Sequence, residues 1–335
     1  MKSAILHGSD GPGCLKIEEV DTPKPAAGEV RVKLKASALN RRDYWMTIGL
    51  YPCMTLPAIP GSDGVGIIDA VGAGGDESLI GRQVVIYPAR AWGDEEHRYG
   101  ADFRALGMPD QGTFAEYICI PDTDFLDKPV HLSWEQAAAI PLAGLTAWRA
   151  LVTHGEVKAG HKVLVTSAGS GVSSFAIQWA VARGAEVYVT SGSEEKIAKA
   201  KAMGACGGVN YRDEGFIKAL SKMSSGFDII IDGTGGDDLN PLLRTLNAGG
   251  RYVFFGATLG NPSVGLEMAK LFFRHIRIQG TTLGSPKEFG AMIDFVNQMK
   301  IEPLIHAVYA LDDVVAAHTL MENFSQTGKI VLRIE

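Results

Sequence analysis

One stretch, residues 161–192, constrains the fold of this chain more than any other. Residues 162–167 form a short apolar run rich in β-branched side chains, which is typical of a buried strand. Small residues occupy positions 168–173, a helical apolar pattern covers residues 175–183, and a second strand follows at residues 186–190. This order of strand, small-residue turn, helix and parallel strand predicts a dinucleotide-binding unit. The small residues let the backbone approach a pyrophosphate, and the start of the helix offers unpaired N–H groups to it.

The turn of this unit departs from the Gly-x-Gly-x-x-Gly pattern of dinucleotide-binding proteins. Its three glycine positions hold Ala168, Ser170 and Ser173, whereas Gly169 and Gly171 stand between them. An ordinary tight turn between packed elements is the alternative interpretation. Because every replacement is small, we retain the dinucleotide interpretation. The residues expected to contact the cofactor here are Ala168, Gly169, Ser170, Gly171 and Val172.

Composition limits the class of protein. A length of 335 residues favours two domains, and 46% hydrophobic with 21% charged residues describes a soluble globular protein. The net charge of −6, with no dense Lys/Arg run, argues against a nucleic-acid partner. The N-terminus turns polar too soon for a signal peptide, and no apolar run reaches the length of a membrane span, so we expect no membrane partner. Four scattered cysteines (Cys14, Cys53, Cys119 and Cys206) favour a reducing, cytoplasmic location.

The rest of the chain carries a series of motifs in a fixed order. Residues 1–128 contain short strand-like runs separated by Gly and Pro turns, which predicts a β-rich domain. The motifs are Pro60-Gly-Ser-Asp-Gly-Val-Gly, Gly112-Thr-Phe-Ala-Glu-Tyr, Ile140-Pro-Leu-Ala-Gly-Leu-Thr-Ala-Trp and Gly328-Lys-Ile-Val-Leu. Together with the dinucleotide unit, they resemble the medium-chain dehydrogenase/reductase superfamily over nearly the whole chain. The resemblance implies an α/β protein with a doubly wound, parallel Rossmann sheet and a GroES-like β-rich catalytic domain. The expected divisions are residues 1–128 for the catalytic domain, 129–283 for the Rossmann domain and 284–335 for a C-terminal return to the catalytic domain.

The resemblance also shows where a catalytic zinc ion would bind. Zinc alcohol dehydrogenases of the superfamily use Cys, His and Cys ligands, and the matching positions here hold Asn40, Ser62 and Leu142. A catalytic zinc needs three protein ligands with nitrogen, sulfur or carboxylate donors, which this set does not provide. The loop from Pro88 to Asp110 also lacks the four cysteines of the structural zinc lobe. We therefore expect no zinc, and a closer resemblance to the zinc-less quinone oxidoreductase branch, which includes zeta-crystallin-like reductases.

The catalytic candidates lie in one segment that matches this branch. Its first position is Asn40, where the zinc enzymes have a cysteine, followed by Asp43, Tyr44 and Tyr51. The amide of Asn40 could donate to a developing oxyanion, and the tyrosines are further donors. A purely structural role for Asp43 stays open as the alternative. No residue is singled out as the general acid, and water could protonate the product.

The end of the second strand of the dinucleotide unit favours NADPH over NADH. Residues 189–193 carry no acid to bind a ribose 2′-hydroxyl, and the first acid is Glu194. Lys196 lies one helical turn later, where its ammonium could reach a 2′-phosphate; a solvated helix residue is its alternative interpretation. By resemblance, Tyr211 lies near the same phosphate, and Arg212 is an additional candidate.

Further cofactor contacts are expected at strand ends and at one helix. By resemblance, Thr146 lies against the nicotinamide, although a buried helix contact would also explain a threonine there. The strands expected at residues 227–232 and 251–256 end in glycine-rich segments at the edge where ligands sit in such sheets. The residues assigned to the cofactor on these grounds are Gly192, Ser193, Gly233, Phe255 and Gly256.

Three functions are compatible with these patterns. The leading hypothesis is an NADPH-dependent, zinc-independent oxidoreductase that transfers hydride to quinones or α,β-unsaturated carbonyl compounds. The second is an alcohol or aldehyde dehydrogenase of the same superfamily. The third is a nucleotide-binding redox sensor or crystallin-like protein with little catalysis. In relatives, strands from the region after residue 250 pair across a two-fold axis, so we expect a homodimer.

Overall fold

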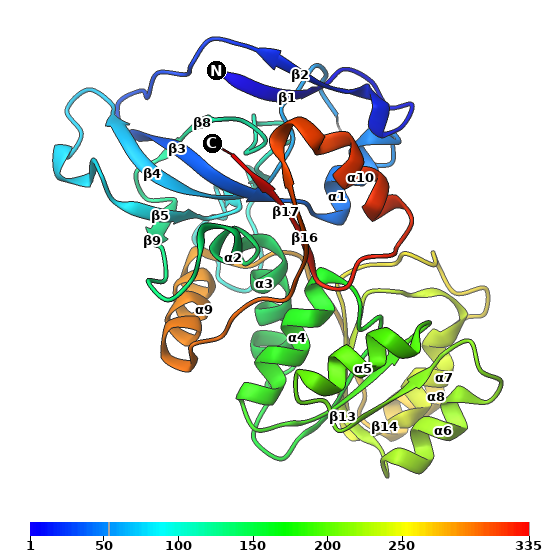
Figure 1. The fold of residues 1–335 in the computed structure, drawn as a ribbon. Helices are drawn as coiled ribbons and strands as arrows, with labels where there is room; N and C mark the ends of the chain where they lie inside the picture. Colours follow the sequence, from blue (N-terminus) through cyan, green and yellow to red (C-terminus); the bar gives the residue numbers. More distant parts are fainter. Residues whose placement is uncertain (53, 335) are drawn as a thin grey trace. The chain divides into compact units, whose positions relative to one another are not determined.

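The computed structural model describes residues 1–52 and 54–334, so Cys53 lies outside the described residues. The chain divides into two compact units, each with its own sheet (Figure 1). Unit 1 comprises Met1–Ala143 and Ser285–Glu335, and unit 2 comprises Gly144–Gly284. Within the described residues, no helix is both long enough and apolar enough to cross a membrane.

Unit 1 is built on a mixed sheet whose central strand is β3 (Glu29–Ala38). Buried and partly exposed side chains alternate along most of β3, as expected for a strand with one face on the core. In the described part of unit 1 the strand order is β16-β17-β3-β4-β5-β9, and β8 also pairs with β3. The other strands of this sheet are β4 (Asp63–Val71), β5 (Gln83–Ile86), β8 (Tyr117–Pro121), β9 (Phe125–Asp127), β16 (Ile305–Ala310) and β17 (Lys329–Arg333). Antiparallel pairs β1 (Lys2–Leu6) with β2 (Leu15–Glu19) and β6 (Ala89–Arg90) with β7 (Arg104–Ala105) accompany it.

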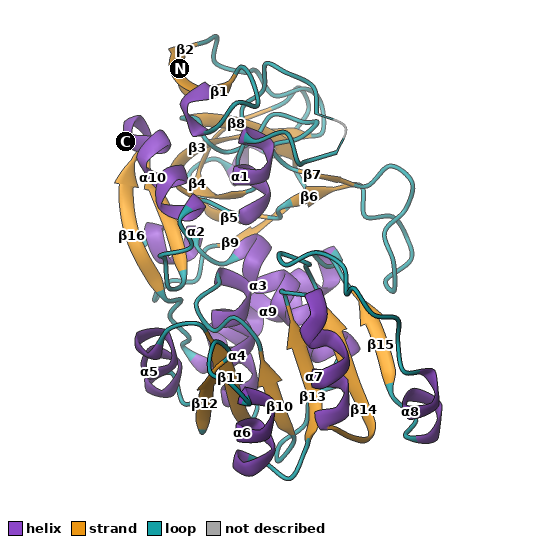
Figure 2. Ribbon diagram, turned by 90° about the vertical axis from the view of Figure 1, so that its right-hand side faces the viewer, coloured by secondary structure: helices purple, strands orange, loops and turns teal. Residues whose placement is uncertain are grey.

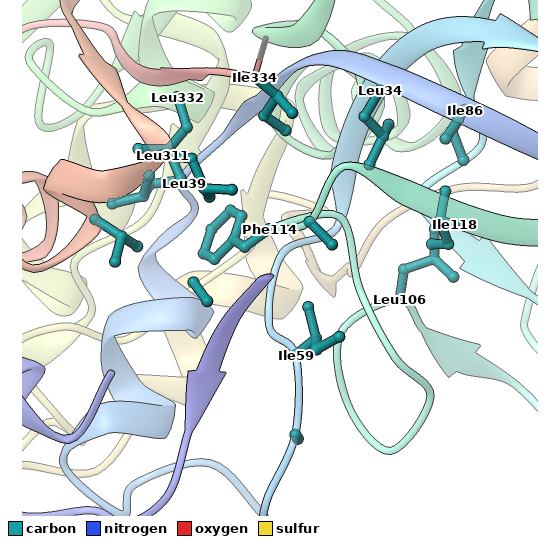
Figure 3. Packing of buried hydrophobic residues seen from close by; sticks show 14 of the residues in the cluster. Leu34, Leu39, Ile59, Ile86, Leu106, Phe114, Ile118, Leu311, Leu332 and Ile334 are labelled. Carbon is teal, nitrogen blue, oxygen red and sulfur yellow. The ribbon is translucent and has the colours of Figure 1, made fainter. Parts of the chain in front are cut away.

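The core of unit 1 joins segments from both ends of the sequence. Phe114 is fully buried, and Figure 3 shows it beside Leu39 and Leu311. The helices of unit 1 are α1 (Arg41–Thr47), α2 (Trp134–Ala138), α9 (Pro286–Met299) and α10 (Val314–Glu322), and α3 (Pro141–Trp148) crosses into unit 2. β16, α10 and β17, which follow unit 2 in the sequence, belong to unit 1 as well.

The first boundary between the units differs from the expected position after residue 128. It falls between Ala143 and Gly144, because α2 packs on β3, β4 and β17 of unit 1. The sequence of a helix that follows a β-rich segment does not show which sheet the helix will pack against. The second boundary, at Gly284, lies one residue from the expected one.

The long loop between β6 and β7 carries a small core of its own. It extends away from the sheet of unit 1 (Figure 2). The rings of Trp92, Tyr99 and Phe103 pack against one another with centroid separations of 4.6–6.1 Å. An ion pair of 2.7 Å between Glu96 and Lys287 ties the loop to the start of α9.

Unit 2 is a doubly wound α/β domain, as the sequence predicts. Its six strands are parallel in the order β12-β11-β10-β13-β14-β15, and a helix follows each of the first five along the chain (Figure 2). The strands are β10 (Lys162–Val165), β11 (Glu186–Ser191), β12 (Gly207–Asn210), β13 (Phe227–Asp232), β14 (Leu246–Phe254) and β15 (Arg277–Gly280). The helices are α4 (Gly171–Ala182), α5 (Glu194–Ala202), α6 (Phe216–Met223), α7 (Leu239–Thr245) and α8 (Met268–Phe273). The order reverses between β10 and β13, and ligands of such sheets bind at the carboxyl ends of the strands beside this switch point.

The strand expected at residues 251–256 begins earlier and ends earlier. β14 starts at Leu246, whose backbone pairs with Phe227 and whose side chain is buried. It ends at Phe254, so Phe255 and Gly256 follow the strand. Both residues nevertheless lie at the carboxyl edge of the sheet, where the sequence places them.

Candidate active site

The turn after β10 forms the N-terminal cap of α4. The helix begins at Gly171, and the Ser170 hydroxyl accepts a hydrogen bond of 3.0 Å from Ser173 N. The Ser173 hydroxyl is buried and donates to Thr166 O at 2.8 Å, which explains a small residue at the third glycine position. The N–H groups of Gly171 and Val172 belong to the first helical turn, where a helix has no internal partner for them. The turn therefore presents donors and the positive end of a helix dipole to an anion.

Two basic side chains and a tyrosine gather at the neighbouring strand ends. A Cβ atom placed on Gly169 would lie 2.5 Å from Cδ and 3.0 Å from Nζ of Lys196, so this side chain lies across the turn. A Cβ atom on Gly192 would lie 2.7 Å from the Tyr211 hydroxyl and 2.9 Å from Nε of Arg212. Ser193 caps α5 through a hydrogen bond of 3.5 Å from Lys196 N. The carboxyl ends of β10 and β11 thus bear a cationic cluster of Lys196 and Arg212 together with Tyr211.

A buried carboxylate organises the switch point itself. Asp232 ends β13 and accepts hydrogen bonds from the hydroxyls of Thr166 and Tyr252. It also accepts from Thr234 N at 3.1 Å, from the Thr234 hydroxyl at 2.6 Å and from Gly235 N at 2.9 Å. Burial and the carboxylate raise the pKa of Tyr252. Asp232 thereby fixes the ends of β10, β13 and β14 in one arrangement.

The remaining cofactor candidates fall into two places. The Phe255 ring lies against Gly233, since a Cβ atom on this glycine would meet the ring at 2.5 Å. A Cβ atom on Gly256 would approach Gly233 O to 3.1 Å, so Gly233, Phe255 and Gly256 are close neighbours. Thr146 is buried on α3.

In unit 1, strand register brings three polar residues together. Ala38 at the end of β3 pairs with Asp63 on one side and with Val331 on the other. Lys329 lies two residues before Val331, so it reaches the end of β3, where Asn40 begins α1. The Lys329 ammonium donates to Asp63 Oδ2 at 2.8 Å, to Asn40 Oδ1 at 2.7 Å and to Leu39 O at 2.8 Å.

Asp63 completes this cluster. Its Oδ2 accepts from Asn40 Nδ2 at 3.0 Å, and its Oδ1 accepts from the backbone N–H of Leu142 at 2.7 Å. The side chains of Lys329 and Asp63 are 2% and 0% exposed. One proton of Asn40 Nδ2 has no hydrogen-bond partner in the part of the chain that the structure describes. The cluster therefore offers one oriented amide donor.

Sequence reasoning missed Lys329. One signal could have identified it: Lys329 stands directly before the apolar run Ile330–Leu332. A lysine in such a buried strand needs a hydrogen-bonding partner for its charge. The lone Asp63 within a glycine-rich apolar segment is the complementary signal. Neither signal reveals that the two residues meet.

A second network surrounds Tyr51 and Ser62. The Arg42 guanidinium donates to the Tyr51 hydroxyl at 2.9 Å and lies 4.6 Å from the centre of its ring. The same guanidinium donates to the Ser62 hydroxyl and to Leu106 O. Because the Tyr51 oxygen accepts from Arg42, its own proton is directed elsewhere. The partly buried Arg42 side chain thus holds Tyr51, Ser62 and the Leu106 carbonyl together.

Two other catalytic candidates do not join the Asn40 amide in one donor group. The Tyr44 hydroxyl donates to the exposed carboxylate of Glu322 at 3.1 Å. Asp43 is fully buried, and its Oδ2 accepts from Asn40 N at 2.7 Å, which stabilises the first turn of α1. Burial is the largest cause that raises the pKa of Asp43 to about 6, and Arg42 opposes it. The geometry agrees with the structural alternative for Asp43.

The comparisons with known proteins agree with this architecture. A family model described as "Alcohol dehydrogenase GroES-like domain" matches residues 26–130, and one described as "Zinc-binding dehydrogenase" matches residues 171–298. The chain is 35% identical to a zinc-type alcohol dehydrogenase-like protein of Leptosphaeria maculans, over 96% of this chain and 94% of that protein. It is 30% identical to a quinone oxidoreductase of Salmonella typhimurium, over 98% of each. A crystal structure of an NAD-dependent alcohol dehydrogenase matches with a TM-score of 0.94 and 36% identity over 100% of both chains.

The chain belongs to the medium-chain dehydrogenase/reductase superfamily. Within it, the chain is a member of the quinone oxidoreductase-like branch and an NAD(P)H-dependent reductase. The GroES-like and Rossmann folds expected from the sequence are confirmed.

Members of this superfamily include zinc enzymes, so the fit of a zinc ion can be tested on the residues present. The Asn40 oxygen already accepts from the Lys329 ammonium, and the Ser62 hydroxyl from the Arg42 guanidinium. A dication placed there would meet the buried Lys329 ammonium and the partly buried Arg42 guanidinium, and Leu142 supplies no side-chain donor. Among residues 1–52 and 54–334, no group of three His, Cys, Asp or Glu side chains could hold a metal ion. The donor set therefore does not fit catalytic zinc.

Proposed function

We propose that this protein is an NADPH-dependent, zinc-independent reductase of quinones or α,β-unsaturated carbonyl compounds. The observation that carries the proposal is the Asn40 amide, which is fixed at the former zinc position with one N–H left for an acceptor oxygen. An amide is a much weaker electrophile than zinc. It suits acceptors whose negative charge spreads over a conjugated system as it develops.

The proposed cofactor contacts all come from unit 2. The start of α4 would hold the pyrophosphate through the N–H groups of the turn, and Thr146, Gly233, Phe255 and Gly256 would line the nicotinamide. Lys196, Arg212 and Tyr211 would hold the 2′-phosphate, because their side chains gather at Gly169 and Gly192. Bound NADPH would supply the hydride for the reaction.

The proposed acceptor contacts come from unit 1. The free Nδ2 proton of Asn40 would donate to the carbonyl oxygen and stabilise the charge that develops there. The Tyr51 hydroxyl is a second donor, since Arg42 occupies its oxygen and leaves its proton available. Asp43 would support Asn40 by accepting its backbone N–H.

The direct test is NADPH oxidation with panels of 1,4-benzoquinones, enones and primary alcohols after dialysis against EDTA. The proposal expects turnover of quinones or enones, a preference for NADPH over NADH, and no gain on addition of zinc. Activity that returns only with zinc would contradict it.

The alternative of an alcohol or aldehyde dehydrogenase rests on the relatives with that name. The crystal structure matched over the whole chain is described as NAD-dependent, and the Leptosphaeria relative as zinc-type. Alcohol oxidation with NAD in the same assay would favour this alternative. NADPH binding without turnover of any acceptor would favour the third hypothesis, a nucleotide-binding protein with little catalysis.

We further propose that unit 2 forms a homodimer through its β15 edge. β15 pairs with β14 on one side, and no strand in the part of the chain that the structure describes pairs with its other side. Next to it, Met268, Phe272 and Phe273 on α8 are 64%, 62% and 76% exposed. An open strand edge beside exposed aromatic side chains fits the same surface of a second copy.

Sedimentation of the wild type and of Phe273→Asp tests this surface. We expect a dimer for the wild type and a monomer for the variant, whereas Met223→Asp at another exposed apolar position (44% exposed) should leave the dimer intact. A monomeric wild type would contradict the dimer.

A cytoplasmic location remains part of the proposal and agrees with the free thiols of Cys14, Cys119 and Cys206.

A further inference from the structure

We infer that Lys329 is a positioning residue that acts through Asn40, by holding the amide so that its N–H points to the acceptor. This inference rests on the proposed function, because it explains how the amide donor of that function is oriented. Lys329 would contact neither the acceptor nor the cofactor. Its partners in the structure are Asn40, Asp63 and the Leu39 carbonyl.

The chemistry of the two neighbours allows only one orientation of the amide. An ammonium group can only donate hydrogen bonds, and an ionised carboxylate can only accept them. Asn40 Oδ1 lies 2.7 Å from the Lys329 ammonium, and Asn40 Nδ2 lies 3.0 Å from Asp63 Oδ2. In the flipped orientation, two donors would face each other at one end of the amide and two acceptors at the other. The pair therefore fixes which atom of Asn40 is left for a ligand.

Both neighbours are themselves held rigidly. Lys329 is at the start of β17, whose register against β3 is fixed, and its ammonium has three acceptors. Asp63 is at the start of β4 and accepts on both oxygens. The ion pair is 2% and 0% exposed, so water does not compete for its hydrogen bonds. A buried ion pair is weak evidence for added stability, because desolvation offsets much of its attraction, whereas it can specify one arrangement.

Removal of one partner alone would leave a buried charge unpaired and destabilise the fold. The test therefore uses the neutral double variant Lys329→Met/Asp63→Asn, which removes both charges and the preference of the amide for one orientation. Lys128→Met is the matched control, because Lys128 also donates to two backbone carbonyls of unit 1, those of Pro129 and Leu132.

The first readout is a mutant cycle in kcat. It compares the wild type, Asn40→Ala, the double variant and the triple variant that combines all three substitutions. Loss of an oxyanion donor lowers kcat by about 100-fold, and loss of its orientation by about tenfold or more. If Lys329 acts through Asn40, the triple variant has the same kcat as Asn40→Ala alone, and KM for NADPH is unchanged throughout. A triple variant that falls below Asn40→Ala by the same factor as the double variant falls below the wild type would overturn the inference. A double variant with the kcat of the wild type would overturn it too.

A second readout does not need activity. In protein labelled with ¹⁵N-asparagine, the side-chain signals of Asn40 are identified by their absence in Asn40→Ala. We expect slow exchange with water for the Nδ2 proton that is bonded to Asp63 in the wild type, and at least tenfold faster exchange of this proton in the double variant. Fast exchange of the bonded proton in the wild type would refute the positioning role, even if the double variant did not fold. A wild type that reduces no acceptor but shows slow exchange would refute the proposed function and leave the positioning of Asn40 intact.

Discussion

The buried histidine of α10 makes unit 1 sensitive to acid. Nδ1 of His318 lies 2.8 Å from Val314 O, which can only accept, so Nδ1 carries the proton of the neutral ring. In the described part of the chain, Nε2 is buried without a hydrogen-bond partner, and the ring packs edge-on against Phe114. A second proton would therefore place a charge in apolar surroundings. Burial lowers the pKa of His318 from 6.5 to about 4.

The size of the effect follows from this pKa. Between pH 6.5 and pH 4 the unfolded chain binds a proton at this site and the folded chain does not, so acid favours unfolding. Each unit of pKa corresponds to about 1.4 kcal/mol. The stability due to the neutral ring is complete above pH 6.5 and falls by about 2 kcal/mol by pH 5.

The assay compares urea unfolding of the wild type with His318→Leu at pH 7.5 and at pH 5. The variant loses the hydrogen bond at both pH values but no longer titrates, so its stability relative to the wild type should improve by about 2 kcal/mol at pH 5. His97→Gln, at an exposed histidine, is the control and should show no such change. A difference between wild type and His318→Leu that is equal at both pH values would refute the reasoning.

Three further predictions address the other buried groups and the cofactor. Tyr252→Phe removes a hydrogen bond to the Asp232 carboxylate and should cost about 1.5–3 kcal/mol in urea unfolding, and no loss would contradict the role of Asp232 as an organiser. Burial raises the pKa of Asp43 from 3.8 to about 6, so its stabilising effect is present below pH 3.8 and is lost as the pH rises through 6. Asp43→Asn, which stays neutral, should therefore gain about 2 kcal/mol relative to the wild type between pH 4.5 and pH 7.5, measured in the same way. Lys196→Ala should raise KM for NADPH about 10- to 100-fold with little change for NADH, and equal effects on both cofactors would remove Lys196 from the 2′-phosphate site.

The sequence predicts those parts of the fold that are determined by residues close together along the chain. β10, the turn and α4 follow one another within about twenty residues, and each follows from apolar spacing and residue size in that short stretch. The replacement of glycine by Ser173 is understandable only with the structure, since its hydroxyl caps the end of β10. The sequence places Lys196 one helical turn after the second strand, and the resemblance places Tyr211 nearby; the structure brings their side chains to Gly169 and Gly192.

The cluster of Asn40, Asp63 and Lys329 could be predicted only in part, because the register between distant strands brings these residues together. Asn40 and Lys329 are separated by 289 residues and meet because β3 pairs with β17. Local patterns do not encode that pairing. Tyr44 and Asp43 share the segment of Asn40, but the helical turn directs one to Glu322 and the other to the backbone of Asn40. Neighbours in the sequence were thus a poor guide to neighbours at the site.

The division of unit 1 into two stretches of chain has a consequence for biosynthesis. The ribosome delivers Asp63 well before Lys329, and the whole of unit 2 emerges between them. Until β17 has been synthesised, β3 lacks one of its paired strands and Asp63 lacks the Lys329 ammonium. Unit 2 can therefore complete its fold during translation, whereas the cluster of Asn40, Asp63 and Lys329 can form only when β17 has emerged.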